Sequence, residues 1–295
     1  MKQDLVADFA SLSPVVPRLS RRGFVASAGA AVGFAAAAGP LAAETVIETD
    51  REGLAEGMVS VTAEDGEKMP TYFARPEEGE GAPLILVVQE IFGLHAYIQD
   101  VCRRLAKEGY FAAAPALYFR QGDPARLENV QKILREIVSQ VPDEQVMSDL
   151  DATVAWAGAL GADRSRLGIT GFCWGGRIVW LYAAHNPAVD AGVAWYGRLT
   201  GDSSQMSPRH PLDVVDELGA PVLGLYGGAD SGIPVATVER MQAALAEAEG
   251  AAGASEIVIY PDAPHAFHSD YRPSYREEAA QDGWKRLLDW FAMHL

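Results

Sequence analysis

One short segment constrains the fold of this 295-residue chain more than any other. An apolar stretch at residues 167–170 runs into the sequence Gly-Phe-Cys-Trp-Gly at residues 171–175. A Gly-x-Cys-x-Gly pattern between a strand and a helix is typical of the nucleophile elbow, with cysteine in the position that serine usually occupies. The segment therefore predicts that Cys173 is a nucleophile at the edge of a sheet. A helix beginning at Trp174 would lower the pKa of its thiol.

Two other interpretations of Cys173 stay open at this point. It could be an inert buried cysteine in a tight turn, or it could form a disulfide with Cys102, the only other cysteine in the chain. Disulfides form in exported proteins, but the motif around Cys173 requires a free thiol. We therefore expect both cysteines to be free, with Cys102 packed as a small apolar group on a helix face.

The apolar runs that follow one another along the chain predict an α/β protein. Residues 57–76 are expected to form an antiparallel hairpin at a sheet edge, with its turn at Asp65-Gly66. The other expected strands are 84–88, 110–114, 166–170, 189–195, 222–226 and 256–260. The expected helices are 96–108, 125–139, 144–160, 174–184, 235–248 and 276–294. Strands separated by helices of this length form a mostly parallel central sheet with helices on both faces, as in the α/β-hydrolase fold. We expect one such domain over residues 44–295.

Two later strands supply an acid and a base in the order that this fold requires. One strand leads into Gly-Gly-Ala-Asp and ends at Asp230, and the next leads to His265. His265 is expected to take the proton of the nucleophile, and Asp230 to orient the imidazole. Asp230 could instead be only a turn or cap residue, with Asp262 or Asp270 as the acid, and His268 competes with His265 as the base.

The first 43 residues predict an export signal. Residues 20–25 read Ser-Arg-Arg-Gly-Phe-Val, an alanine-rich run follows, and small residues end it at Ala43. This order is typical of a cleaved twin-arginine signal, and less so of a membrane anchor or a core helix. It predicts the twin-arginine export machinery as a partner, a periplasmic or secreted location, and no membrane span after cleavage.

The net charge of the chain limits the classes of partner that it is expected to bind. The formal net charge is −16, which argues against a nucleic-acid partner, because binding phosphates requires a basic surface. No His or Cys cluster has metal-ligand spacing, so neither a metal nor another cofactor is expected. The expected ligand is a small-molecule ester or lactone.

From about Gly57 onward, the chain resembles the dienelactone hydrolase family (carboxymethylenebutenolidases). Four segments carry the resemblance: Gln-Glu-Ile-Phe-Gly-Leu at 89–94, Gly-Phe-Cys-Trp-Gly-Gly at 171–176, Gly-Gly-Ala-Asp at 227–230 and Pro-His-Ala-Phe at 264–267. The resemblance implies hydrolysis of a lactone or carboxylic ester through an acyl-enzyme, with Cys173, Asp230 and His265 as the triad. A broad-specificity esterase or thioesterase remains an alternative, as does a non-catalytic protein that binds a small ligand.

The resemblance also implies roles for residues outside the triad. Glu90 is similar to the additional carboxylate of the family, which holds the thiol in the resting enzyme and helps to form the thiolate. A buried carboxyl group at such a strand end has a raised pKa unless it is paired, whereas a solvated strand-end residue would have no such role. The backbone N–H groups of Ile91 and Trp174 are similar to the oxyanion hole.

The substrate of the family carries a carboxylate that arginines bind. Arg120 resembles one of these arginines. The second would be expected four residues after His265, where this chain has Ser269, and the nearest candidate is Arg272. These two arginines are therefore the expected substrate-binding residues.

Overall fold

The computed structural model describes residues 46–295, so the predicted export signal lies outside the described residues. Its core is one sheet with the strand order β1-β2-β4-β3-β5-β6-β7-β8. The strands are β1 (Leu54–Thr62), β2 (Lys68–Pro76), β3 (Pro83–Val88), β4 (Phe111–Pro115), β5 (Asp163–Phe172), β6 (Ala191–Trp195), β7 (Val222–Gly227) and β8 (Glu256–Tyr260). The pairs β1–β2 and β2–β4 are antiparallel, and the other neighbours are parallel. The predicted edge hairpin and the mostly parallel sheet are both confirmed.

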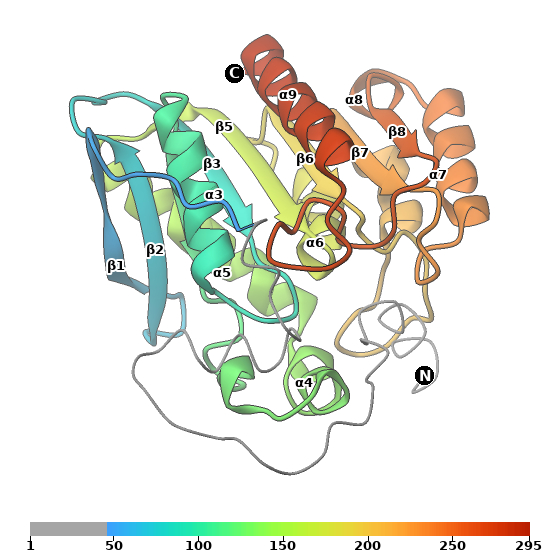
Figure 1. The fold of residues 1–295 in the computed structure, drawn as a ribbon, viewed down its shortest axis with the longest axis horizontal. Coiled ribbons are helices and arrows are strands. Elements are labelled where there is room, and N and C mark those ends of the chain that lie inside the picture. The colour runs from blue at the N-terminus through green and yellow to red at the C-terminus, as the bar shows by residue number, and fades with distance from the viewer. Residues whose placement is uncertain (1–45) are drawn as a thin grey trace.

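Helices cover both faces of this sheet, as predicted for the α/β-hydrolase fold. The α-helices of the described residues are α3 (Ala96–Lys107), α4 (Val130–Glu136), α5 (Asp143–Ala159), α6 (Trp174–His185), α7 (Val235–Glu247), α8 (Gly250–Gly253) and α9 (Glu277–His294). Helices α3 and α9 lie in front of the sheet in the view of Figure 1, and α6 lies behind it. The Tyr182 hydroxyl donates a hydrogen bond to Asp151 (2.8 Å), which ties α6 to α5. None of the helices formed by residues 46–295 is long and apolar enough to cross a membrane.

The helix predicted over residues 125–139 is wrong in its extent. The chain there forms a 3-10 helix at Pro124–Arg126, then α4, then another 3-10 helix at Val138–Gln140. Asn129 adopts an extended conformation and its side chain accepts a hydrogen bond from the Lys132 N–H, so a new helix is capped in the middle of the predicted one. The short elements at Pro211–Glu217 and α8 were also missed, because they are too short to show a period.

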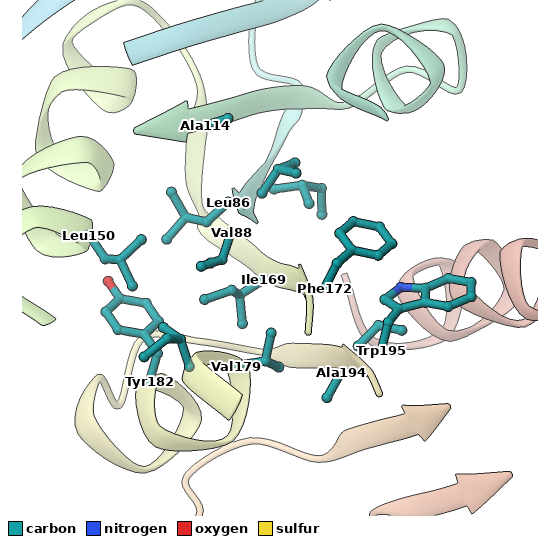
Figure 2. Packing of buried hydrophobic residues seen from close by; sticks show 14 of the residues in the cluster. Leu86, Val88, Ala114, Leu150, Ile169, Phe172, Val179, Tyr182, Ala194 and Trp195 are labelled. Carbon is teal, nitrogen blue, oxygen red and sulfur yellow. The ribbon is translucent and has the colours of Figure 1, made fainter. Parts of the chain in front are cut away.

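The core fixes the strand that carries the nucleophile. In Figure 2, Ile169 of β5 lies between β3 and α6, and Val179 and Tyr182 of α6 pack beneath it. Phe172, the last residue of β5, stacks on Trp195 of β6 at 5.5 Å between ring centroids. These side chains are buried, and each contributes about 1.5–3 kcal/mol when removed from water. The end of β5 is thus held rigidly where the turn into α6 begins.

Candidate active site

Cys173 lies at the turn between β5 and α6 in a strained backbone conformation. Its φ angle is +57°, which is rare for a residue other than glycine. The flanking glycines allow close approach of the backbone. A Cβ atom at Gly171 would lie 2.4 Å from the carbonyl oxygen of Gly175, and one at Gly175 would lie 2.4 Å from that of Val88. The glycines therefore bring the start of α6 against the end of β3, as the elbow motif predicts.

His265 and Asp230 form a buried pair at the same edge of the sheet. His265 Nδ1 lies 2.6 Å from Asp230 Oδ2, and both residues are buried. The other carboxylate oxygen of Asp230 accepts the backbone N–H groups of Gly232 (2.8 Å) and Ile233 (3.1 Å). Asp230 is therefore both a turn residue and the partner of the imidazole. Its carboxylate is held in one orientation by backbone donors.

The electrostatics of His265 and Cys173 are linked. Burial alone would lower the pKa of His265, but the charges of Asp230 and of the Cys173 thiolate hold it well above its usual value. Burial raises the pKa of the Cys173 thiol, although the charge and hydrogen bond of His265 act against it. The N-terminus of α6 acts on this pKa in the expected direction, but the net shift is upward. The Trp174 backbone N–H does act that way, but burial outweighs it.

The competing residues lie in other environments. His268 Nδ1 bonds the Tyr97 hydroxyl, and its ring lies 4.4 Å from that of Trp195. Burial lowers the pKa of His268 well below its usual value. Asp270 pairs with Arg104. Both cysteines are free, with Cys102 buried on α3, so the disulfide interpretation is wrong.

Glu90 is fully buried and has several partners. Its two carboxylate oxygens accept hydrogen bonds from Ser269 Oγ (3.0 Å) and the Tyr271 hydroxyl (2.5 Å), and His95 Nε2 lies 3.5 Å away. Burial alone would raise the pKa of Glu90, but the hydrogen bond from His95, the charge of Arg272 and the Tyr271 hydroxyl lower it to about 2. Glu90 is thus a paired, ionised carboxylate, and its charge raises the pKa of the thiol.

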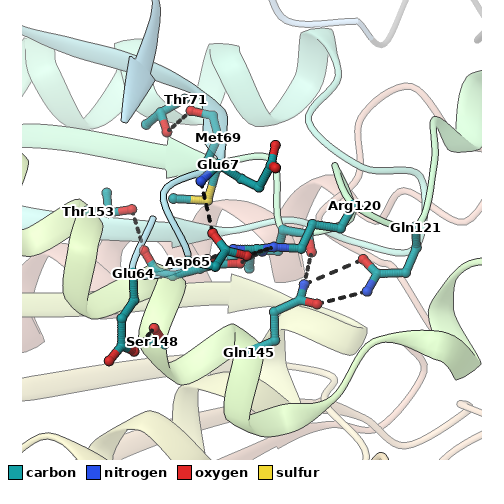
Figure 3. A network of polar contacts seen from close by, with 12 residues as sticks. Glu64, Asp65, Glu67, Met69, Thr71, Arg120, Gln121, Gln145, Ser148 and Thr153 are labelled. Atoms are coloured by element: carbon teal, nitrogen blue, oxygen red, sulfur yellow. Dashed lines mark hydrogen bonds and ion pairs between the residues drawn. The ribbon is translucent and has the colours of Figure 1, made fainter. Parts of the chain in front are cut away.

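The two predicted arginines lie in different places. Arg272 is buried beside Glu90, with its guanidinium 4.6 Å from the Phe92 ring centroid. Arg120 bonds both oxygens of Asp149 (2.7 and 3.0 Å) and one of Asp65 (2.6 Å). Figure 3 shows this cluster beside Gln121 and Gln145. The structure does not bring Arg120 to the cavity of Cys173, because two carboxylates already hold its guanidinium elsewhere.

A cavity of about 360 Å³ opens onto Cys173 and His265. The loop after β6 supplies Tyr196 and Arg198 to its wall, and Arg177 of α6 lies there in two hydrogen bonds to Asp143. Tyr196 has a φ angle of +38° and its ring lies 5.1 Å from that of His265. This loop could not be predicted as part of the site, because it carries no motif and no regular element until Pro211.

The predicted oxyanion donors belong to adjoining segments. The N–H of Trp174 is at the first residue of α6 and acts on the Cys173 sulfur. Ile91 follows Gln89 and Glu90, and the Gln89 carbonyl is in close approach to Gly175. Between residues 46 and 295, the structure shows no group of three or more His, Cys, Asp or Glu side chains placed to hold a metal ion.

Comparison with known proteins gives consistent matches. The model of the dienelactone hydrolase family matches residues 69–295. A Methylorubrum extorquens protein assigned as carboxymethylenebutenolidase is 62% identical over 290 residues, covering 98% of this chain and 97% of its own length. A Bradyrhizobium protein assigned as 2-oxo-3-(5-oxofuran-2-ylidene)propanoate lactonase is 35% identical, with 78% and 92% covered. The crystal structure of a Klebsiella pneumoniae protein assigned as dienelactone hydrolase is 55% identical, with a TM-score of 0.79 and coverage of 82% and 99%.

Proposed function

The chain belongs to the dienelactone hydrolase family, and we propose that it hydrolyses a lactone or carboxylic ester through an acyl-enzyme formed on Cys173. The observation that carries this proposal is the strained Cys173 turn, which faces the same cavity as a buried His265–Asp230 pair. A nucleophile, a base and an orienting carboxylate are the three parts that covalent catalysis of acyl transfer requires.

The proposed reaction breaks the ester C–O bond in its first half and the thioester C–S bond in its second, with His265 carrying one proton in each half. Because Asp230 holds Nδ1 of His265, the imidazole would receive the thiol proton at Nε2 as the sulfur attacks the carbonyl carbon. The N–H groups of Ile91 and Trp174 would stabilise the oxyanion. The C–O bond then breaks, and His265 returns the proton to the leaving oxygen. In the second half, His265 takes a proton from water as the water oxygen bonds to the carbonyl carbon; the C–S bond then breaks, the acid leaves, and the imidazolium returns the proton to the Cys173 sulfur.

Burial, assisted by the charge of Glu90, would keep the thiol protonated before substrate binds. A carboxylate with a pKa of about 2 is ionised at neutral pH, and its field opposes formation of a second negative charge on Cys173. Protonated thiols resist oxidation better than thiolates. We therefore assign to Glu90 the role of limiting thiolate in the resting enzyme, with the proton transferred to His265 once a carbonyl is in place.

The substrate class is proposed from the family and its members. The lactonase assignment of the Bradyrhizobium relative favours a lactone, and other esters or thioesters would use the same residues. A non-catalytic role as a small-ligand binder would leave Cys173 unreactive. For residues 1–43 we propose a twin-arginine signal that exports the protein to the periplasm or beyond. Amino-terminal sequencing of the exported protein would locate the cleavage.

Replacement of the nucleophile tests the proposed function. Cys173→Ala should abolish the release of 4-nitrophenolate from 4-nitrophenyl acetate and the hydrolysis of dienelactone. Cys102→Ala is the matched control, because Cys102 is equally buried but lies within α3. We expect that control to retain turnover, with some loss of stability. Equal turnover by Cys173→Ala and the wild-type protein would refute the proposal.

A further inference from the structure

The loop that follows β6 forms one wall of the cavity of Cys173 and His265. Its residues Arg198, Asp202, Met206 and His210 are among those that line this cavity. Residues 198–210, all of which the structure describes, contain no helix or strand. The position of this wall relative to the nucleophile therefore depends on the contacts that hold the loop to the rest of the molecule.

Both ends of the loop lie against the start of α6. A Cβ atom added at Gly197 would lie 2.3 Å from the backbone nitrogen of Arg177, so the loop begins in backbone contact with the helix. At the other end, Arg177 Nη2 donates to the Arg209 carbonyl (2.6 Å) and Arg177 Nε to His210 Nδ1 (3.3 Å). The same guanidinium group donates two hydrogen bonds to Asp143 of α5 (2.7 Å each). Arg177 thus joins the end of the loop to two helices.

The contacts of the His210 ring define its protonation state. Its Nε2 lies 3.2 Å from the backbone carbonyl oxygen of Asp202. An arginine side chain can only donate hydrogen bonds, and a carbonyl oxygen can only accept them. Nδ1 must therefore be the nitrogen without a hydrogen, because it accepts from Arg177, and Nε2 must carry the hydrogen. Only the neutral imidazole with its hydrogen on Nε2 makes both contacts.

Protonation of this ring would break its contact with Arg177. A proton on Nδ1 would leave Arg177 Nε without its acceptor and would place a second positive charge beside a guanidinium group that is 4% exposed. Arg198, from the same loop, is a further positive charge that acts against protonation. The neighbouring Arg209 is exposed and pairs with Glu217.

The carboxylates near His210 compensate only in part. The charge of Asp143 favours a protonated ring, but both of its oxygens already bond Arg177. Asp213 accepts the backbone N–H of His210 (2.9 Å), and Asp202 is exposed. Burial, followed by the charge of Arg177, lowers the pKa of His210 below its usual value of 6.5. The ring is therefore neutral at pH 7, in agreement with its hydrogen-bond geometry.

We propose that His210 is a positioning residue, whose neutral ring holds the 198–210 loop to Arg177 and so shapes the substrate-binding wall of the Cys173 cavity. Protonation of the ring in acidic solution releases this end of the loop and weakens binding, without acting on the reacting atoms. This inference rests on the proposed ester or lactone hydrolysis and names a residue outside the triad on which binding by that site depends.

The pH dependence of ligand binding tests this role. N-phenylbutanamide, an unreactive analogue of a phenyl ester, serves as a competitive inhibitor of 4-nitrophenyl butyrate hydrolysis, so its inhibition constant reports binding alone. In the wild-type protein this constant should rise about tenfold from pH 7.5 to pH 5, the equivalent of about 1.4 kcal/mol. His210→Asn keeps an acceptor oxygen for Arg177 but cannot be protonated in this range, so its constant should not change with pH. His185→Asn, at the exposed end of α6, is the matched control and should show the wild-type rise.

Two further measurements need no activity. The nitrogen chemical shifts of ¹⁵N-labelled histidine distinguish the two neutral tautomers, and the resonances that His210→Asn lacks belong to this ring. We expect the Nε2–H tautomer at pH 7.5 and protonation only below pH 6.5. After correction for the intrinsic effect of pH, amide hydrogen exchange in residues 198–210 should be faster at pH 5 than at pH 7.5, with no such change in the strands of the core.

The outcomes separate this inference from the proposed function. An Nδ1–H tautomer at pH 7.5 would refute the positioning role, as would the same pH dependence of the inhibition constant in the wild-type protein and His210→Asn. In either case Cys173-dependent hydrolysis could still stand. If the tautomer and the exchange behave as expected but no ester is hydrolysed, the contact that holds the loop stands and the proposed function fails.

Discussion

Arg272 and Arg120 lie in two regions that surround the guanidinium group with different partners. Arg120 joins the β1–β2 turn to α5, where Asp65 and Asp149 together neutralise it. Arg272 lies beside the nucleophile, where its neighbours are a tyrosine hydroxyl, an aromatic face and the charge of Glu90. In the first region two carboxylates hold one guanidinium group, and the three side chains act as a structural clamp away from the nucleophile. In the second region Arg272 and Glu90 lie beside Cys173, so their charges act on the pKa of its thiol.

The largest expected effect comes from the acid of the triad, in the second region. Asp230→Asn should lower kcat about 10³-fold or more, because the amide no longer stabilises the imidazolium and can select the wrong tautomer of His265. Steady-state hydrolysis of 4-nitrophenyl acetate measures this. Asp262→Asn, in the exposed turn after β8, is the control and should keep its activity. A similar loss in both variants would contradict the assignment of Asp230.

Matched substitutions of the two arginines test the comparison itself. Arg272→Gln should lower kcat/KM about tenfold, since it removes a charge that acts on Glu90 and Cys173. Arg120→Gln should retain activity and lower the free energy of unfolding by about 2 kcal/mol, because Asp149 is left buried without its ion pair. Urea unfolding and ester hydrolysis measured on both variants would separate these effects. If Arg120→Gln loses activity while its stability is unchanged, the two regions have been assigned the wrong way round.

The smallest expected effect is a shift in the titration of Cys173. Replacing Glu90 by Gln removes a negative charge that raises the thiol pKa, so this pKa should fall. The rate of alkylation by iodoacetamide, followed from pH 6 to 10 by mass spectrometry, would then rise at a lower pH than in the wild-type protein. Glu108→Gln, on the exposed end of α3, should not shift the profile. A profile that stays unchanged or moves to higher pH for Glu90→Gln would refute the role given to its charge.

The contrast between the two arginines also shows what a single sequence reveals about such a site. Cys173, Asp230 and His265 each follow an apolar strand, and parallel strands place their carboxyl ends at one edge. Their proximity could therefore be predicted. The ion pair between Arg120 and Asp149 could not be predicted, because it joins residues 29 positions apart on separate elements. The partners Ser269 and Tyr271 of Glu90 were missed for the same reason, since they lie about 180 residues away in a loop without a motif.

The boundaries of the helices show the same limit on what can be predicted from sequence. The buried strands are continuous apolar runs separated by long helical stretches, and both were predicted to within a few residues. Residues 125–139 were predicted as one helix, although the cap at Asn129 starts a new helix within that range. Side-chain caps decide such boundaries, and they compete with a helical period that continues across them.

In the proposed mechanism Cys173 carries the acyl group, and trapping that intermediate is the decisive test. The protein would be mixed with excess 4-nitrophenyl acetate, quenched with acid during the first turnover, digested and examined by mass spectrometry. We expect one acetyl group on the peptide that contains Cys173, formed with a burst of 4-nitrophenolate and absent from Cys173→Ala. Acetyl on another residue, or turnover by Cys173→Ala at the wild-type rate, would contradict it.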